Sequence, residues 1–151
     1  MDSDVLVRCD IAELGKMCNL ANAYKAVYVV KHNYDPKDSV KFLGEKQTKY
    51  EKKNWSSVML FNNGRCRNLT TGYVNTAPGL DLHQFKWTSD GQVGELDKNW
   101  NHLVGEYPPN PEAKIVHFTR GGPWFRDYED CEFSKEWFEE YESMSHPYEK
   151  Q

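Results

Sequence analysis

The chain has 151 residues, of which 38% are hydrophobic and 28% are charged, a composition typical of one globular domain. The net charge is −4, from 19 Lys and Arg against 23 Asp and Glu. This balance excludes a general nucleic-acid binder, because such proteins present a basic surface. No apolar run approaches the roughly 20 residues of a membrane-spanning helix, and the acidic start of the sequence is unlike a signal peptide.

The cysteines are Cys9, Cys18, Cys66 and Cys131, and no two of them have C-x-x-C spacing. The pattern predicts neither a zinc site nor a disulfide framework. Free thiols are the expected state of such residues in a reducing compartment. Together with the lack of a signal peptide and of a transmembrane segment, this leads us to expect a cytoplasmic protein.

The first segment places Asp2 and Asp4 directly before a short apolar strand, Val5–Val7. Two carboxylates separated by one residue are a suitable oxygen-ligand pair for a hard divalent cation. The alternative reading is an acidic N-terminus that is simply solvated.

Two regular elements and one irregular segment are predicted next. Asp10 and Glu13 have the spacing of a capping box, which predicts a helix of one or two turns ending near Gly15 or Cys18. Ala26–Val30 is an apolar run without a breaker and predicts a buried central strand. Residues 32–53 are polar and rich in lysine. Such a segment is usually a solvated loop, and its functional alternative is a mobile flap over an anionic donor or an acidic acceptor.

The middle of the chain reads as short elements separated by turn signals. In chain order we expect a strand over Ser56–Phe61, a turn at 62–64, a short helix starting at Leu69-Thr70, a helix entered at Gly79 that carries His83 and Gln84 on one turn, and a strand over Val93–Leu96.

The segment Lys114–Trp124 combines a buried strand with a glycine loop. Lys114–Phe118 is β-branched and aromatic and delivers His117 to the end of the strand. Gly121 and Gly122 then allow positive φ and a close backbone approach. An imidazole as third ligand favours manganese over calcium, because nitrogen suits transition metals better. The alternative is a core histidine followed by an ordinary turn.

The last predicted element is a helix over Ser134–Met144, which Ser134 can cap. Phe133, Trp137, Tyr141 and Met144 recur at spacings of four, four and three, so they share one helical face. We expect this stripe to pack in the core.

Taken together, these segments resemble the metal-dependent glycosyltransferases of the GT-A fold, in particular the glycogenin-like family of retaining enzymes. In that family an Asp-x-Asp pair and a late histidine, in a His-Phe-x-Gly-x-x-Lys-Pro-Trp segment, bind one manganese ion on the diphosphate of a UDP-sugar. The order and approximate spacing hold from Asp2 to about Tyr141. The matching segments are Asp2-Ser-Asp4, Trp55–Phe61, His83-Gln84, Leu96–Asn101 and His117–Trp124.

The sequence departs from the family pattern in three places. The family carries a nucleotide-binding, Rossmann-like half before its Asp-x-Asp motif, and this sequence starts at the motif. The lysine before Pro-Trp is Gly122 here, with Arg120 as the nearest cation. The acidic residue of the family's usual Asp-Gln pair is His83.

The resemblance implies an α/β fold in which a mixed sheet is packed with helices, the carboxyl-side half of a GT-A fold. Residues 1–151 would form a single truncated glycosyltransferase domain that uses a UDP-sugar and an unknown sugar, lipid or protein acceptor. The alternative is a catalytically weak or inactive module that binds metal, nucleotide-sugar or carbohydrate.

The resemblance also implies a set of site residues. Asp2, Asp4 and His117 would bind Mn²⁺, with Mg²⁺ as the alternative ion. The remaining assignments are His83 and Gln84 in the catalytic pocket, Ser56, Ser57 and Asn101 on the substrate, and Arg120, Gly121 and Gly122 on the diphosphate.

A homo-oligomer is expected as well. A carboxylate pair at the second and fourth residues frays unless it is tied down, and the strand Val5–Val7 would lie at a sheet edge. Packing against a second copy would bury this edge and fix the terminus.

Overall fold

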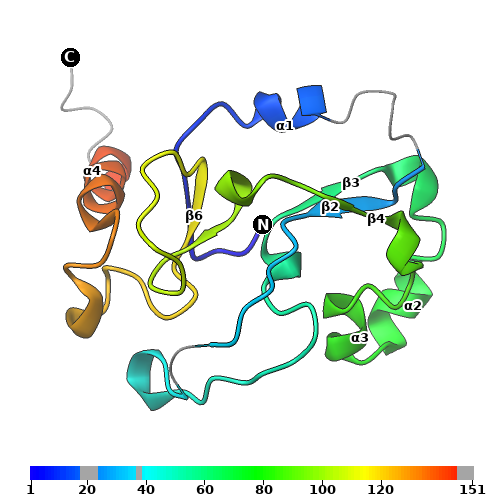
Figure 1. The fold of residues 1–151 in the computed structure, drawn as a ribbon, viewed down its shortest axis with the longest axis horizontal. Helices are drawn as coiled ribbons and strands as arrows, with labels where there is room; N and C mark the ends of the chain where they lie inside the picture. The colour runs from blue at the N-terminus through cyan, green and yellow to red at the C-terminus, as the bar shows by residue number, and fades with distance from the viewer. Residues whose placement is uncertain (18–23, 37–38, 146–151) are drawn as a thin grey trace.

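The computed structural model describes residues 1–17, 24–36 and 39–145. It is a mixed α/β structure with two small three-stranded sheets, ordered β1-β6-β5 and β3-β2-β4 (Figure 1). The strands are β1 (Val5–Val7), β2 (Val27–Val29), β3 (Met59–Phe61), β4 (Val93–Glu95), β5 (His102–Leu103) and β6 (Ile115–His117). The α-helices are α1 (Ala12–Met17), α2 (Thr71–Thr76), α3 (Gly79–His83) and α4 (Ser134–Ser145).

Short 3-10 turns connect these elements. They are η2 (Phe42–Gly44), η3 (Trp55–Ser57), η4 (Asn63–Arg65), η5 (Asp90–Gln92), η6 (Lys98–Trp100) and η7 (Arg126–Tyr128). No helix within the described ranges combines the length and the apolar character needed to cross a bilayer.

Strand β2 is the centre of one sheet, as its sequence predicts. It pairs antiparallel with β3 and parallel with β4, and all three of its residues are buried. A parallel pair needs a long crossover connection, and here β3, α2 and α3 lie between β2 and β4 in the chain. On one face of the sheet Val27 and Val29 pack against Phe85 and Trp87.

Strand β6 is the centre of the other sheet. It pairs antiparallel with β1 and parallel with β5, and its three residues are also buried. The register places Val5 opposite His117, so the first residues of the chain lie beside the end of β6. Trp100 packs in one cluster with Tyr28 of β2 and Ile115 of β6, which joins the two sheets through a common core.

The predicted helix after Asp10 is confirmed, although its capping differs from the prediction. Asp10 Oδ1 accepts a hydrogen bond of 2.9 Å from the Ala12 amide at the start of α1. Glu13 does not reach back to close a capping box. Its carboxylate instead forms an ion pair with Lys114, which lies just before β6. The predicted end near Cys18 lies outside the described residues.

The predicted strand over Ser56–Phe61 is wrong in its first half. Ser56 and Ser57 belong to the turn η3, and the strand starts only at Met59. The cause is local: Asn54 adopts a left-handed conformation with φ 61°, and the Ser57 hydroxyl donates to the Asn54 carbonyl at 2.7 Å. That hydrogen bond gives the backbone an alternative to a strand.

The last helix forms as predicted, but its aromatic stripe is only partly core. Phe133 and Trp137 pack on the cluster of Leu6, Val116 and Phe118. In contrast, Tyr141 is 54% exposed and Met144 is 76% exposed. The helix runs along one side of the molecule toward the C-terminus (Figure 1). Its second half therefore extends beyond the cluster of Leu6, Val116 and Phe118 that packs against its first half.

Candidate metal centre

Asp2, Asp4 and His117 come together at the junction of β1 and β6. His117 Nε2 lies 3.4 Å from Asp4 Oδ1 and 4.0 Å from Asp2 Oδ2. One ligand atom from each residue lies within 4.8 Å of the others. This juxtaposition follows from the antiparallel register, which sets Val5 opposite His117.

Backbone hydrogen bonds hold both carboxylate residues in place. The Phe118 amide donates to the Asp4 carbonyl at 3.0 Å, which extends the β1–β6 ladder by one pair. The Asp2 amide donates to the Ser57 carbonyl at 2.8 Å. The first residues are therefore held by two other segments, the end of β6 and the turn η3. Chain termini usually lack such contacts.

Burial and charge distinguish the three groups. The His117 side chain is buried, the Asp4 side chain is 35% exposed and the Asp2 side chain is 51% exposed. A hydrogen bond from His117 lowers the pKa of Asp4 below its ordinary value, and partial burial opposes this shift. His117 Nε2 is the nitrogen that faces the carboxylates, and Nδ1 is buried without a hydrogen-bond partner among the described residues.

The donor set suits a divalent transition metal. Two carboxylate oxygens and one imidazole nitrogen match Mn²⁺ better than Ca²⁺, which prefers oxygen ligands throughout. Three protein ligands also leave coordination positions open for water or for oxygens of a ligand.

An open hollow of about 340 Å³ lies beside the carboxylates, and its walls are largely aromatic. The Phe42 and Phe125 rings stack with centroids 4.8 Å apart, and the Trp124 ring meets Phe118 edge-on at 5.7 Å. The lining residues are Asp2, Ser3, Asp4, Phe42, Phe118, Gly121, Trp124 and Phe125.

The glycine loop shapes the hollow, and one of its amides is already bonded within the loop. The Gly121 amide donates to the Phe118 carbonyl at 2.9 Å, so it is satisfied within the loop. Gly121 has φ 134°, a conformation that disfavours any side chain. At Gly122 a Cβ atom would lie 2.1 Å from the Trp124 ring. The indole therefore fills the space that a side chain at position 122 would need.

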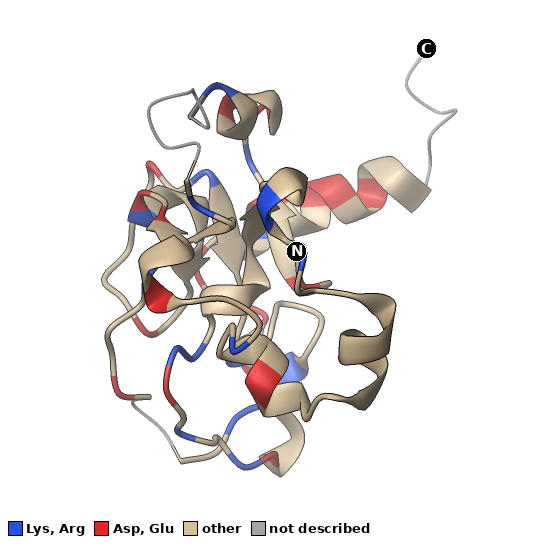
Figure 2. Ribbon diagram, turned by 90° about the vertical axis from the view of Figure 1, so that its right-hand side faces the viewer, with Lys and Arg blue, Asp and Glu red and all other residues tan. Residues whose placement is uncertain are grey.

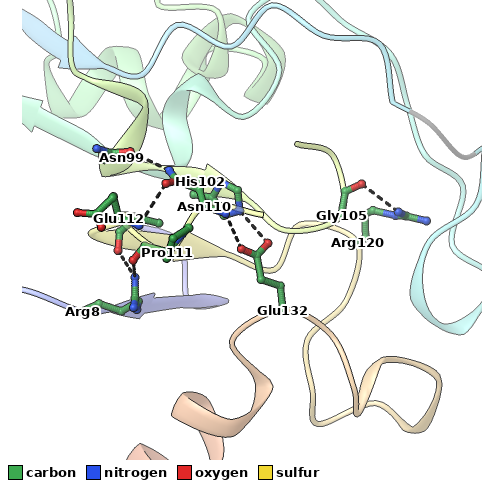
Figure 3. Close-up of polar contacts among 10 residues, drawn as sticks. Arg8, Asn99, His102, Gly105, Asn110, Pro111, Glu112, Arg120 and Glu132 are labelled. Carbon is green, nitrogen blue, oxygen red and sulfur yellow. Dashed lines mark hydrogen bonds and ion pairs between the residues drawn. The ribbon is translucent and has the colours of Figure 1, made fainter. Parts of the chain in front are cut away.

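The Arg120 side chain contacts Gly105 and Glu106, whereas the family resemblance assigns it to a phosphate. Its Nη1 donates to the Gly105 carbonyl at 3.4 Å (Figure 3). Its Nε lies 3.9 Å from the buried carboxylate of Glu106. Arg120 is not among the residues that line the hollow.

Ser56 and His83, two predicted site residues, are in direct contact. The Ser56 hydroxyl lies 2.6 Å from His83 Nδ1, and the Tyr50 ring lies 6.3 Å from the His83 ring. The pair is connected to the metal centre through the chain, because Ser57, the residue after Ser56, accepts a hydrogen bond from the Asp2 amide. Gln84 follows α3, and its carbonyl accepts a hydrogen bond of 3.0 Å from Lys52 Nζ.

Ser57 and Asn101 are buried and serve as internal supports. Asn101 Nδ2 donates to Ser57 Oγ at 2.8 Å and to the Asn54 carbonyl at 3.0 Å. Asn54 Nδ2 in turn donates to Tyr34 and to Thr119. Neither Ser57 nor Asn101 reaches a surface where it could touch a substrate, contrary to their predicted role.

A second cavity, of about 470 Å³, opens between the end of β2 and the loop after β5. His32, His102 and Tyr107 contribute to its wall. His32 Nδ1 lies 3.0 Å from the Tyr107 hydroxyl, and His102 Nε2 lies 3.0 Å from the Glu132 carboxylate (Figure 3). Burial, reinforced by the charges of His117 and His102, lowers the pKa of His32 to about 3.

Several residues at the metal centre have no signal in the sequence. Phe42 and Tyr50 come from the polar lysine-rich segment, which has no hydrophobic period, and Phe125 follows a proline loop. Asn54 organises the support below the site through a left-handed backbone. That conformation is enriched in asparagine, but one asparagine does not predict it.

Comparison with known proteins shows similarity to a plant protein. The chain is 41% identical over 152 residues to Protein CDI of Arabidopsis thaliana, a match that covers 96% of this chain and 58% of Protein CDI. The chain thus spans a little over half the length of that relative, whose name states no activity. No protein-family profile and no solved structure matches the chain.

Proposed function

We propose that this chain is the carboxyl-side part of a metal-dependent glycosyltransferase of the GT-A fold, which binds a UDP-sugar through its diphosphate. The single observation that carries the proposal is the convergence of Asp2, Asp4 and His117 within 4.8 Å. Asp2 and Asp4 are far from His117 in the sequence, and these three are the residues that the family resemblance assigns to the metal.

In this proposal Asp2, Asp4 and His117 hold Mn²⁺, with Mg²⁺ as the alternative. A bound ion supplies Lewis-acid stabilisation of the negative charge that develops on the departing diphosphate. The chain's own groups bind and orient the donor: the aromatic walls of the hollow exclude water, and Ser56 with His83 faces the sugar. No side chain beside the site is proposed as a covalent nucleophile.

The alternative function is a module that binds metal and nucleotide-sugar without turnover. Two observations favour it. Ser57 and Asn101 are buried, so two of the substrate contacts of the family resemblance are missing. The chain also covers only 58% of Protein CDI, so the remaining part of such a protein could supply groups that catalysis needs.

A hydrolysis assay separates the two functions. Purified protein is incubated with a panel of UDP-sugars and Mn²⁺, and released UDP is measured against an EDTA control. Release that requires Mn²⁺ and is lost in Asp4→Asn supports the enzyme. Binding of UDP-sugar that requires Mn²⁺, without release of UDP, supports the binding module. Failure to bind UDP or any UDP-sugar in the presence of Mn²⁺ contradicts both.

A further inference from the structure

The tip of the lysine-rich segment is fixed against the hollow. The Phe42 amide donates to the Arg120 carbonyl at 3.0 Å, and the Phe42 ring stacks on Phe125. A bridge between Val40 and Lys46 closes the tip behind it. Because Phe42 lines the hollow together with Asp2 and Asp4, its neighbour Lys41 stands at the rim of the candidate metal centre.

A second lysine lies close to the first. Lys53 directly precedes Asn54, whose side chain bonds to Thr119 at the end of β6. Burial lowers the pKa of Lys53, the positive charge of Lys41 lowers it further, and the negative charge of Glu106 opposes part of this shift. The charge of Lys41 also acts on Asp4, where it adds a small part to the lowering caused by His117. Both ammonium groups therefore stand near one another and near the metal centre.

Within the described ranges neither lysine has an acidic partner at ion-pair distance. Lys53 Nζ donates to the Thr48 carbonyl at 2.7 Å, and Lys41 Nζ lies 5.2 Å from the Phe42 ring. Other lysines of the same segment are paired: Lys49 with Asp35 at 2.6 Å and Lys52 with Asp90 at 2.5 Å. Basic positions recur along the irregular segment at the lower end of the molecule in Figure 2.

Two neighbouring, partly buried ammonium groups that form no ion pair with a described residue repel one another and are incompletely solvated. The carboxylates of Asp4 and Glu106 act on them only from beyond ion-pair distance. Multiple anionic oxygens relieve both costs, and phosphate groups provide them. Beside the lysines, the carboxylates and imidazole suit a cation. A ligand that carries oxygens for both sites, such as a diphosphate on a divalent metal, would satisfy the whole constellation.

We propose that Lys41 and Lys53 bind the phosphate oxygens of a metal-bound diphosphate. The identification of that diphosphate as part of a UDP-sugar rests on the proposed function, whereas the recognition of phosphate by the two lysines does not. The lysine-rich segment thereby takes the place of Arg120 and the Gly121 amide, whose donors are directed elsewhere.

The test measures pyrophosphate and UDP binding by calorimetry in the presence of Mn²⁺, for the wild type, Lys41→Gln, Lys53→Gln and the double variant. Lys46→Gln is the matched control, because Lys46 belongs to the same tip and is exposed. We expect the Kd for either ligand to rise about tenfold per lysine, the loss of one charge-assisted hydrogen bond. Lys46→Gln should bind like the wild type, and Mn²⁺ alone should bind each variant at least as tightly as the wild type.

The outcomes distinguish the phosphate-binding role of the two lysines from the proposed glycosyltransferase function. Affinities for both ligands within twofold of the wild type in all three variants would overturn the role of the lysines, as would a wild type that binds neither ligand at millimolar concentration. Weaker binding of both ligands in the lysine variants, combined with no discrimination between UDP and pyrophosphate and no release of UDP from any UDP-sugar, supports the phosphate site and contradicts the glycosyltransferase.

Discussion

Ser56 Oγ lies 2.6 Å from His83 Nδ1, and this contact sits one residue from the carbonyl that holds the Asp2 amide. The turn η3 thus contacts two distant segments, the start of the chain and the end of α3. The pair is partly exposed to solvent, so it can contact a bound molecule. Its connection to the Asp2 segment makes it our candidate contact for the group attached to the diphosphate.

We predict that Ser56→Ala and His83→Ala weaken binding of UDP-sugars about tenfold, the value of one or two hydrogen bonds. Binding of UDP should change little, because UDP lacks the sugar. Calorimetry with UDP-glucose, UDP-galactose and UDP in the presence of Mn²⁺ checks the difference. Ser89→Ala, at an exposed turn position, is the control. Equal losses for UDP and UDP-sugars would show that the pair has no role at the sugar.

Acid should destabilise the protein through His32. The pKa of its buried imidazole is about 3 in the folded state and about 6.5 in an unfolded chain. Between these values the unfolded state binds the extra proton, so the free energy of unfolding falls as pH decreases from about 6.5 toward 3. One such group contributes a slope of at most about 1.4 kcal/mol per pH unit.

Urea denaturation at several pH values between 7.5 and 4 measures this slope. His32→Gln should reduce it, because glutamine does not titrate. Tyr107→Phe is the matched control: it removes the hydroxyl beside His32 Nδ1 but keeps the imidazole, so the acid sensitivity should persist. The same slope in His32→Gln as in the wild type would assign the acid sensitivity to other groups.

Gly94 should be essential to the packing of β4 against β2. A Cβ atom at this position would lie 2.4 Å from the Tyr28 ring, which is buried on the neighbouring strand. We expect Gly94→Ala to lower the free energy of unfolding by about 1–3 kcal/mol, as is typical of overpacked cores. Gly91→Ala should have a small effect, since no atom lies within 4 Å of its Cβ position. Similar stabilities of the two variants would contradict this account.

The elements that the sequence predicts best are those with a clear hydrophobic pattern. The unbroken apolar run at 26–30 predicts a buried central strand, and β2 is one. Thr70 caps α2 by accepting from the Tyr73 amide, and the helix α4 follows from its aromatic period. Ser134, predicted as its cap, is instead the first residue of the helix. The partition of the strands into two sheets was not predicted, because pairing depends on contacts far apart in sequence.

The candidate metal ligands could be selected from their types and from the family resemblance, and β1–β6 pairing places them together. The residues that support the site could not be selected in this way. Ser57 was expected on the substrate, but the left-handed turn at Asn54 points its hydroxyl inward. Arg120 is expected on a phosphate, but its guanidinium lies 3.9 Å from the buried carboxylate of Glu106. Tertiary contacts decide where such side chains point, and no local sequence pattern predicts these contacts.

Self-association through β1 remains a prediction. Strand β1 is at the edge of its sheet. The Arg8 amide and the Asp4 carbonyl face β6, so by strand alternation the Val7 amide faces outward. Such an edge can pair with a second copy. Light scattering at micromolar concentration should give a homo-oligomer, and Val7→Pro should shift it toward monomer while Val7→Thr does not. A wild type that is monomeric at this concentration would contradict the prediction.

The most direct test of the central claim is Mn²⁺ binding to the protein alone, measured by electron paramagnetic resonance of the free ion. The account predicts one bound ion per chain in the wild type, and a Kd at least about tenfold higher in Asp4→Ala and in His117→Ala, because each removes one of three protein ligands. Asp10→Asn, which keeps the cap of α1 and lies outside the cluster, should bind like the wild type. Wild-type affinity in both Asp4→Ala and His117→Ala would show that these residues do not form a metal centre.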